Sequence, residues 1–295
     1  MYYVLQSHCC KLLCNECLRK VHVHVHDPGG PLSYAVRTGA IVDDIVVENM
    51  QAQYELYVEE RMHHPAPRAT RAEGIAVIAV ATGDGMHRLL SDELNAARVI
   101  SGGQTMNPST DDFLKAIDSL PNREIILLPN NKNIVLAAQQ AANLSQSKRV
   151  HVVTSTTVPQ GISAMVAYAN LAETGTLDEI AEAMQGAVSQ IITCEVTTAI
   201  RDSHLNGLAI QQEQYIGLLD GDLVVVGDEA DRVVCDLLQK AVDDSHELVT
   251  LYYGTSLEPS APQALVATLS EAFPDLEFEI VYGGQFLYPY IFSVE

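Results

Sequence analysis

The segment IAVIAVATGDG, residues 75–85, decides the fold class of this chain. Seven consecutive apolar residues that end abruptly in Thr-Gly-Asp-Gly predict a strand that is buried on both faces. Shorter apolar runs recur at 125–128 and 150–153, and one-sided helical patterns such as that over 113–120 separate them. Strands that alternate with helices predict an α/β fold with a largely parallel, doubly wound sheet.

A second set of elements predicts an additional α+β lobe. Thr176-Leu177-Asp178-Glu179 has the pattern of a capping box, which marks the start of a helix. Helices are also predicted over 230–241 and 264–272, and strands over 191–200, 223–226, 248–253 and 276–280. Pro289 lacks a backbone N–H, so the terminal apolar segment is predicted to be an edge strand.

The chain before residue 74 divides into three pieces. Residues 1–19 show neither helical nor strand periodicity and form an atypical N-terminal segment. Residues 20–62 predict a small βαβ-like domain, with strands over 21–26 and 41–48 and helices over 31–37 and 49–60. Residues 63–73 are polar, contain proline and have the composition of a linker, so we expect the main α/β domain to span 74–295.

The charge balance excludes whole classes of partner. Lys and Arg total 17 against 38 Asp and Glu, which gives a formal charge of −21. A field of that sign repels nucleic acid backbones and anionic membrane surfaces, so nucleic acid is excluded as a partner. No run of about 18 apolar residues and no export signal occur, so we expect a cytoplasmic protein without a membrane span.

Four loops rich in Gly, Ser, Thr and Asn follow the predicted parallel strands, at 82–85, 101–110, 129–133 and 154–161. Because ligands of parallel sheets bind at the carboxyl ends of the strands, we expect these loops to converge and to suit a carboxylate, a phosphate or a partner's backbone. Ordinary caps and turns explain any single loop, so only their convergence favours function. The candidate partner- or ligand-binding residues are Gly102, Gly103, Gln104, Thr105, Asn107, Ser109, Thr110, Asn130, Asn131, Lys132, Ser155, Gln160 and Gly161.

The same loops offer no catalytic motif. No nucleophile elbow, Walker loop, Rossmann glycine fingerprint or HExxH occurs, so no catalytic residue is assigned. Asp84, which lies between two glycines, fits a helix N-terminal acid better than a ligand for a substrate hydroxyl.

A histidine strand is the second candidate site. In Val21-His22-Val23-His24-Val25-His26 the imidazoles alternate with valines, so a strand would place them on one face, where alternate residues can chelate one metal. Cys14 and Cys17 form a CxxC nearby, although the combined spacing matches no standard zinc pattern. Structural histidines remain an equal alternative to a metal site.

The motifs that carry a family resemblance occur in a fixed order. GGQTMNPST at 102–110 is the most specific, and LPNNKN at 128–133, PQG at 159–161 and YGGQ at 282–285 follow it. Upstream, KVHVH begins at Lys20 and DPG at Asp27. Over about residues 20–295, these segments resemble the A-type subunit of fatty acid kinase, which is related to dihydroxyacetone kinase.

The resemblance implies a kinase component of three parts: a nucleotide-binding domain, a middle domain with a metal site and a carboxy-terminal α/β domain. Residues 20–62 would be a remnant of the middle domain, and the family's zinc-binding histidines map onto His22 and His24. His26 departs from the family pattern, and Cys14 and Cys17 are not evident counterparts of its metal-binding cysteine. The family's clustered aspartates are not present in these 295 residues, so we expect ATP and magnesium only through a further domain.

Three hypotheses follow for function. The first is a module that docks a fatty-acid-binding protein in ATP-dependent acyl phosphate formation; whether this chain is itself an enzyme, and whether it forms a homodimer, stay open. The second is a free-standing protein that binds a small anion or acyl group with the strand-end loops, which an enclosed pocket would favour over an open shelf. The third is a nonfunctional fragment, which the atypical residues 1–19 would favour.

Overall fold

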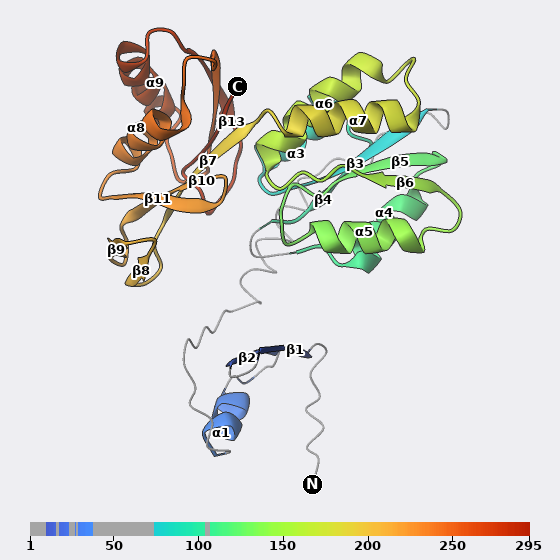
Figure 1. Cartoon of the computed structure of the whole chain (residues 1–295), viewed down its shortest axis with the longest axis horizontal. Helices are drawn as coiled ribbons and strands as arrows, with labels where there is room; N and C mark the ends of the chain where they lie inside the picture. Colours follow the sequence, from blue (N-terminus) through green and yellow to red (C-terminus); the bar gives the residue numbers. More distant parts are fainter. Residues whose placement is uncertain (1–9, 16–17, 24–26, 28, 38–73, 104–106) are drawn as a thin grey trace. The chain divides into compact units, whose positions relative to one another are not determined.

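A computed structural model describes residues 10–15, 18–23, 27, 29–37, 74–103 and 107–295, which belong to two units, 1–56 and 57–295 (Figure 1). In the first unit, β1 (Cys10–Asn15) pairs antiparallel with β2 (Leu18–Val23), and α1 (Gly29–Arg37) follows. β1 lies within the atypical segment 1–19, where CKLLCN has no apolar alternation and forms a strand through its pairing with β2. The strand predicted over 41–48 and the helix over 49–60 lie outside the described residues.

The second unit begins with a four-stranded parallel sheet. Its strands are β3 (Ile75–Ala81), β4 (Arg98–Ser101), β5 (Glu124–Leu128) and β6 (Arg149–Val152), in the order β4-β3-β5-β6. All three pairs are parallel, and every residue of β3 is buried. The doubly wound sheet predicted from residues 75–85 is therefore confirmed.

Helices cover both faces of this sheet (Figure 1). α4 (Thr110–Ser119) and α5 (Val135–Leu144) pack on one face. α3 (Asp84–Arg88), the π-helix η1 (Leu89–Glu93), α6 (Val158–Leu171) and α7 (Leu177–Val188) pack on the other. Residues 74–191 are called the first lobe below.

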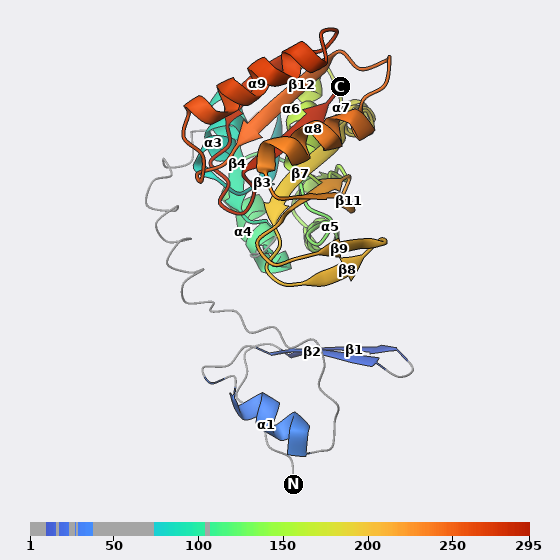
Figure 2. The ribbon, with the colours of Figure 1, turned by 90° about the vertical axis from the view of Figure 1, so that its left-hand side faces the viewer.

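The second lobe, residues 192–295, is built on a six-stranded mixed sheet. Its strands are β7 (Ile192–Thr198), β10 (Tyr215–Leu219), β11 (Asp222–Gly227), β12 (Leu248–Tyr253), β13 (Glu277–Tyr282) and β14 (Tyr290–Val294). The order is β11-β10-β7-β14-β12-β13, with β12 and β13 parallel and the other pairs antiparallel. A small hairpin, β8 (Ser203–Leu205) and β9 (Leu208–Ile210), lies beside β11 (Figure 2).

The two faces of the six-stranded sheet have different neighbours. α8 (Ala230–Ala241) and α9 (Ser260–Ala272) cover the face away from the first lobe and bury Cys194 and Phe292 (Figure 1). The opposite face packs on the first lobe, where Tyr252 and Ile291 join the core around β3 and α7.

The last strand corrects a prediction. Pro289 predicted an edge strand, but β14 lies between β7 and β12 and is buried throughout. Pro289 precedes the first strand residue, so its missing N–H removes no bond from the ladder, and its carbonyl oxygen accepts a bond from the Gly254 N–H at 2.9 Å. Within the described part of the chain, no helix is long and apolar enough to cross a membrane.

Candidate functional site

The carboxyl ends of β3, β4, β5 and β6 place the four polar loops at one edge of the parallel sheet. Hydrogen bonds tie neighbouring loops together. The Thr82 hydroxyl donates to the Gly102 carbonyl at 2.6 Å, and the Asn130 side-chain amide donates to the Val80 carbonyl at 2.9 Å. The loops therefore form one continuous surface, as expected from their positions after parallel strands.

Asn130 is the internal anchor of this surface. Its backbone adopts φ of 54°, and its side chain is buried. The Ser155 hydroxyl donates to Asn130 Oδ1 at 2.6 Å and accepts from the Asn130 N–H at 3.1 Å. A methyl group on Gly161 would stand 2.1 Å from Asn130 Oδ1, so only glycine fits there. These three candidate residues hold the loops in place and have little bonding capacity left for a ligand.

The loop after β4 combines close packing with a helix cap. A methyl group on Gly103 would stand 2.3 Å from Thr82 Oγ1. Ser109 caps α4, because its hydroxyl oxygen accepts the Asp112 N–H at 3.3 Å, while the Asp112 carboxylate accepts the Ser109 N–H at 2.9 Å. Thr110 donates to Gln140 of α5 at 3.1 Å, and Asn107 is exposed. Gln104 and Thr105 lie outside the described residues.

Lys132 lies where the candidate site approaches the second lobe. Lys132 is exposed, whereas Asn131 is buried and accepts the Asn133 N–H at 2.9 Å. The Lys132 ammonium lies 3.5 Å from where a methyl group on Gly221 would stand. Burial raises the pKa of Glu195 on β7 to about 6; Lys132 opposes this rise and Asp220 adds to it.

Sequence reasoning missed Glu195 and Asp220. Glu195 lies within an apolar strand, and Asp220 precedes a glycine in a tight turn, so neither carries a local motif. The Asp220 carboxylate accepts the Thr193 N–H at 2.9 Å, and the Thr193 and Thr157 hydroxyls are 2.7 Å apart. Gln160, the remaining candidate in that loop, accepts from the Thr156 N–H at 2.8 Å.

The loop after β3 contacts the segment around Gly283 in the second lobe. The Met86 N–H donates to the Gly283 carbonyl at 2.9 Å, and a methyl group on Gly83 would stand 2.4 Å from the same oxygen. Asp84 is the first residue of α3 and pairs with Arg88 at 2.8 Å, as expected for a helix N-terminal acid. This loop therefore joins the two lobes.

Exposed apolar side chains border the polar loops. Leu136, which follows Lys132 at the start of α5, is 63% exposed, and Phe286, which follows the Gly283–Gln285 loop, is 64% exposed. Ile200 is 79% exposed, and a bond of 2.7 Å from the Thr197 hydroxyl to the Leu287 carbonyl joins its segment to that of Phe286.

Two hollows of the described surface lie away from these loops. One, of about 420 Å³, lies beside β11 and α8, and another, of about 620 Å³, lies between α7 and His151 of β6. Both open to solvent, and neither is lined by the four loops. Among the described loop residues, Asn107, Ser109, Lys132 and Asn133 are exposed to solvent, so these parts of the loops form an open shelf.

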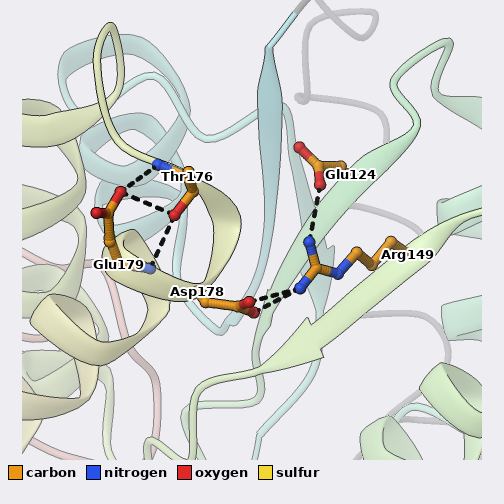
Figure 3. Close-up of polar contacts among 5 residues, drawn as sticks. All are labelled: Glu124, Arg149, Thr176, Asp178 and Glu179. Carbon is orange, nitrogen blue, oxygen red and sulfur yellow. Dashed lines mark hydrogen bonds and ion pairs between the residues drawn. The ribbon is translucent and has the colours of Figure 1, made fainter.

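Arg149 anchors the opposite edge of the sheet (Figure 3). From the start of β6 it pairs with Asp178 of α7 at 2.6 Å and with Glu124 of β5 at 3.3 Å. Beside it, the Thr176 N–H and hydroxyl both donate to the Glu179 carboxylate, at 2.9 and 2.8 Å, which confirms the predicted capping box (Figure 3). These contacts fix α7 and belong to the scaffold.

The histidine strand is described only in part. His22 lies in β2, where the register sets Lys11 opposite it and Arg19 opposite Cys14. His24, His26 and Cys17 lie outside the described residues. Within the described ranges, no group of three or more His, Cys, Asp or Glu is placed to hold a metal ion. The zinc site therefore stays a prediction.

Comparison with known proteins gives matches along most of the chain. Residues 76–295 match the family model of the fatty acid kinase FakA-like C-terminal domain, and residues 7–56 match the model of the FakA-like middle domain, FakA being the A-type component of that kinase. Uncharacterized proteins from Staphylococcus aureus strains MRSA252 and USA300 are each 34% identical over 281 residues, which cover 95% of this chain and 50% of the relative. The chain thus spans about half the length of the curated relatives it matches.

Several solved structures share the fold. Dihydroxyacetone kinase of C. freundii aligns with a TM-score of 0.57 at 13% identity, covering 86% of this chain and 57% of that one. A DegV family protein of Corynebacterium glutamicum aligns with a TM-score of 0.56 at 16% identity, covering 75% and 97%. A Thermotoga maritima protein with a fatty acid binding function aligns with a TM-score of 0.52 at 13% identity, covering 75% and 99%. At such identities the likeness shows the fold alone.

Proposed function

Since the chain belongs to the FakA-like family of fatty acid kinase proteins, we propose that it docks a fatty-acid-binding protein during ATP-dependent acyl phosphate formation. The partner would hold the acyl chain and present its carboxylate. ATP and magnesium would be bound by a further domain, and the complex would work in the cytoplasm.

The open shelf formed by the strand-end loops is the observation that carries this proposal. An enclosed apolar pocket would suit a protein that holds an acyl chain by itself. The described loops instead offer polar groups on the surface, with Lys132 exposed and Leu136 and Phe286 beside them. An apolar contact beside a polar, shallow surface suits a protein partner.

The histidines of the first unit have a separate proposed role. His22 and His24 would hold a zinc ion that stabilises the small domain around β1, β2 and α1. Neutral imidazole nitrogens are good zinc ligands, and such an ion contributes directly to folding. No step of phosphoryl transfer is assigned to it.

Isothermal titration calorimetry tests the proposal. The purified chain is titrated in separate runs with a fatty-acid-binding protein of the same kinase system loaded with fatty acid, with free fatty acid, and with ATP and magnesium. Binding of the loaded protein alone is the expected result. Binding of ATP, or no binding of the loaded protein, would overturn the proposal, and binding of free fatty acid would favour a small-molecule binding protein.

A pair of variants on one helix locates the docking surface. Leu136→Ser removes the apolar side chain beside Lys132, and Leu144→Ser removes one that is similarly exposed at the far end of α5. We expect Leu136→Ser to weaken binding of the loaded protein about tenfold and Leu144→Ser to change it less than about twofold. Equal effects of the two variants would place docking elsewhere.

A further inference from the structure

The hollow of about 420 Å³ in the second lobe lies at the free edge of its sheet. Leu208 of β9 forms one side, Val224–Val226 of β11 form the floor, and Asp236 and Lys240 of α8 form the other side. We call this hollow the β11 groove. We propose that it binds an extended peptide that has an apolar centre and basic ends.

β11 has an unpaired side because it is the last strand of its sheet. Among the described strands it pairs with β10 alone, so alternate backbone N–H and C=O groups on its outer side bond to none of these strands. A bulge leaves Val224 without an opposing residue, since Val225 pairs with Gly217 and Leu223 with Leu218. The Asn206 side-chain amide donates a hydrogen bond to the Leu223 carbonyl at 3.1 Å, so this carbonyl already has a partner. The segment open to a visiting strand is therefore 224–227.

The opposite edge of the same sheet is protected differently. On β13, Glu277 and Glu279 are exposed and alternate with Phe278 and Ile280. Charged residues on an edge strand discourage pairing with another chain. β11 has no charged residue between Leu223 and Gly227, and Val224 and Val226 remain partly exposed. The unprotected edge thus coincides with the groove.

The charge around the groove selects the occupant. Asp222 begins β11 and Asp228 directly follows it, and both are exposed. Residues 192–295 contain 18 Asp and Glu but three Lys and Arg, which gives the second lobe a formal charge of −15; one of the three basic residues, Lys240, lies on the α8 side of the groove with Asp236. A strand that adds to an edge gains main-chain hydrogen bonds, and complementary charges at its ends fix its position. Basic residues flanking three or four apolar residues fit this pattern.

A second copy of this chain fits poorly. Antiparallel pairing of β11 with its own copy, centred on Val225, would set Asp222 opposite Asp228, and in-register parallel pairing would set each aspartate beside its equivalent. Like charges placed directly opposite each other destabilise a strand pair. Both copies of the lobe would also carry the same excess of negative charge, so the occupant is a different, basic segment.

Fluorescence anisotropy with two labelled peptides tests the proposal on the full chain. The first probe is Lys-Val-Thr-Val-Thr-Val-Lys, and the second has glutamate in place of both lysines. We expect the lysine-ended peptide to bind at least about tenfold more tightly, with an affinity that falls as salt is added. Equal binding of the two peptides, or no binding of the lysine-ended one, would overturn the proposal.

A charge reversal in the groove supplies the matched comparison. Asp236→Lys reverses a wall residue whose contact is a loose pair with Arg232 at 3.7 Å, so the fold should tolerate it. Glu271→Lys reverses an exposed acid on α9, outside the groove. The first variant should weaken the lysine-ended peptide about tenfold and the second less than about twofold. Equal weakening would mean attraction to the lobe as a whole and would contradict a defined groove.

Hydrogen exchange distinguishes strand addition from loose adhesion. With saturating lysine-ended peptide, amides within 224–227 should exchange more slowly, because the visiting strand bonds the outward groups. Amides of β13 should keep their rates. Slower exchange at β13, or unchanged exchange at β11, would contradict the proposal. The outcome of this experiment does not depend on whether a fatty-acid-binding protein docks at the strand-end loops.

Discussion

Gly85 at the start of α3 lies against the carbonyl of Tyr282, so that a methyl group on this glycine would stand 2.0 Å from that oxygen. The contact joins the first lobe to the second. Gly83, with φ of 96°, makes a similar approach to Gly283. The lobes therefore approach each other backbone to backbone at this joint, next to the Arg88 guanidinium, which lies 5.9 Å from the centre of the Tyr282 ring.

Gly85→Ala should lower the free energy of unfolding by about 2–4 kcal/mol, because a methyl group forces the lobes apart at a joint made of backbone. Gly186→Ala is the control, since space around Gly186 in α7 is open and alanine favours helix. It should raise stability by about 0.5–1 kcal/mol. Urea unfolding measures both, and a loss below about 1 kcal/mol for Gly85→Ala would show that the joint adjusts easily.

Asn130→Ala should lower the free energy of unfolding by about 2–4 kcal/mol. The substitution removes the buried hydrogen bonds to the Ser155 hydroxyl and the Val80 carbonyl, and it places alanine at a positive φ. Asn95→Ala separates the two causes. Asn95 also has a positive φ, of 58°, but its side chain is not buried. Thermal unfolding should show a clearly smaller loss for Asn95→Ala, and equal losses would mean that backbone strain explains both.

Glu195 should make the protein less stable as pH rises. Its pKa in the folded chain is about 6, above the ordinary value of 4.5, so folding disfavours its charged form. Its contribution is fully present below pH 4.5 and is lost as pH rises through about 6. Glu195→Gln should remove this loss and gain up to about 2 kcal/mol at pH 7. Urea unfolding from pH 4 to 8 measures it, and curves that stay parallel would contradict the assignment.

Zinc content tests the histidine strand. The purified chain should hold about one zinc ion, and the double variant His22→Ala with His24→Ala should lose it. His204→Ala, which changes an exposed histidine of β8 in the second lobe, should keep it. Mass spectrometry of the metal after gel filtration measures the ratio, and zinc retained by the double variant would rule out these ligands.

Arg149→Gln should change stability by less than about 1 kcal/mol, because exposed ion pairs contribute little. Arg149 has a side chain that is 56% exposed, although it contacts both Asp178 and Glu124. Docking of the loaded fatty-acid-binding protein should not change, since Arg149 lies at the opposite edge from the loops. Urea unfolding and titration calorimetry of the variant measure the two quantities, and weakened docking would move the docking surface to this edge.

Elements with a pronounced local pattern were predictable from sequence. β3 and β5 are unbroken apolar runs, and Thr176 with Glu179 spells a capping box. β4 was missed, because RVIS has two apolar residues and gains its stability from pairing with β3. β8, β9 and β10 were missed as well, since short strands around turns have weak patterns.

The candidate site was predictable in position but not in detail. Parallel strands bring their carboxyl ends together whatever the loops contain, which is why the four loops meet. The contacts of Gly83 and Gly85 with residues 282–285 depend on how the lobes pack, because these segments lie about two hundred residues apart in the chain. Glu195 gains its raised pKa from the same packing.

The backbone joint between the lobes has a mechanical consequence. A side chain at an interface can change rotamer and so allow two lobes to rotate relative to each other. A peptide group packed against a glycine has no rotamer to change. These close backbone contacts should therefore limit how far the loops after β4, β5 and β6 and the exposed Phe286 can move relative to one another. A fatty-acid-binding protein that docks as proposed would then meet a surface of limited mobility, and much of the adjustment of fit would fall to that protein.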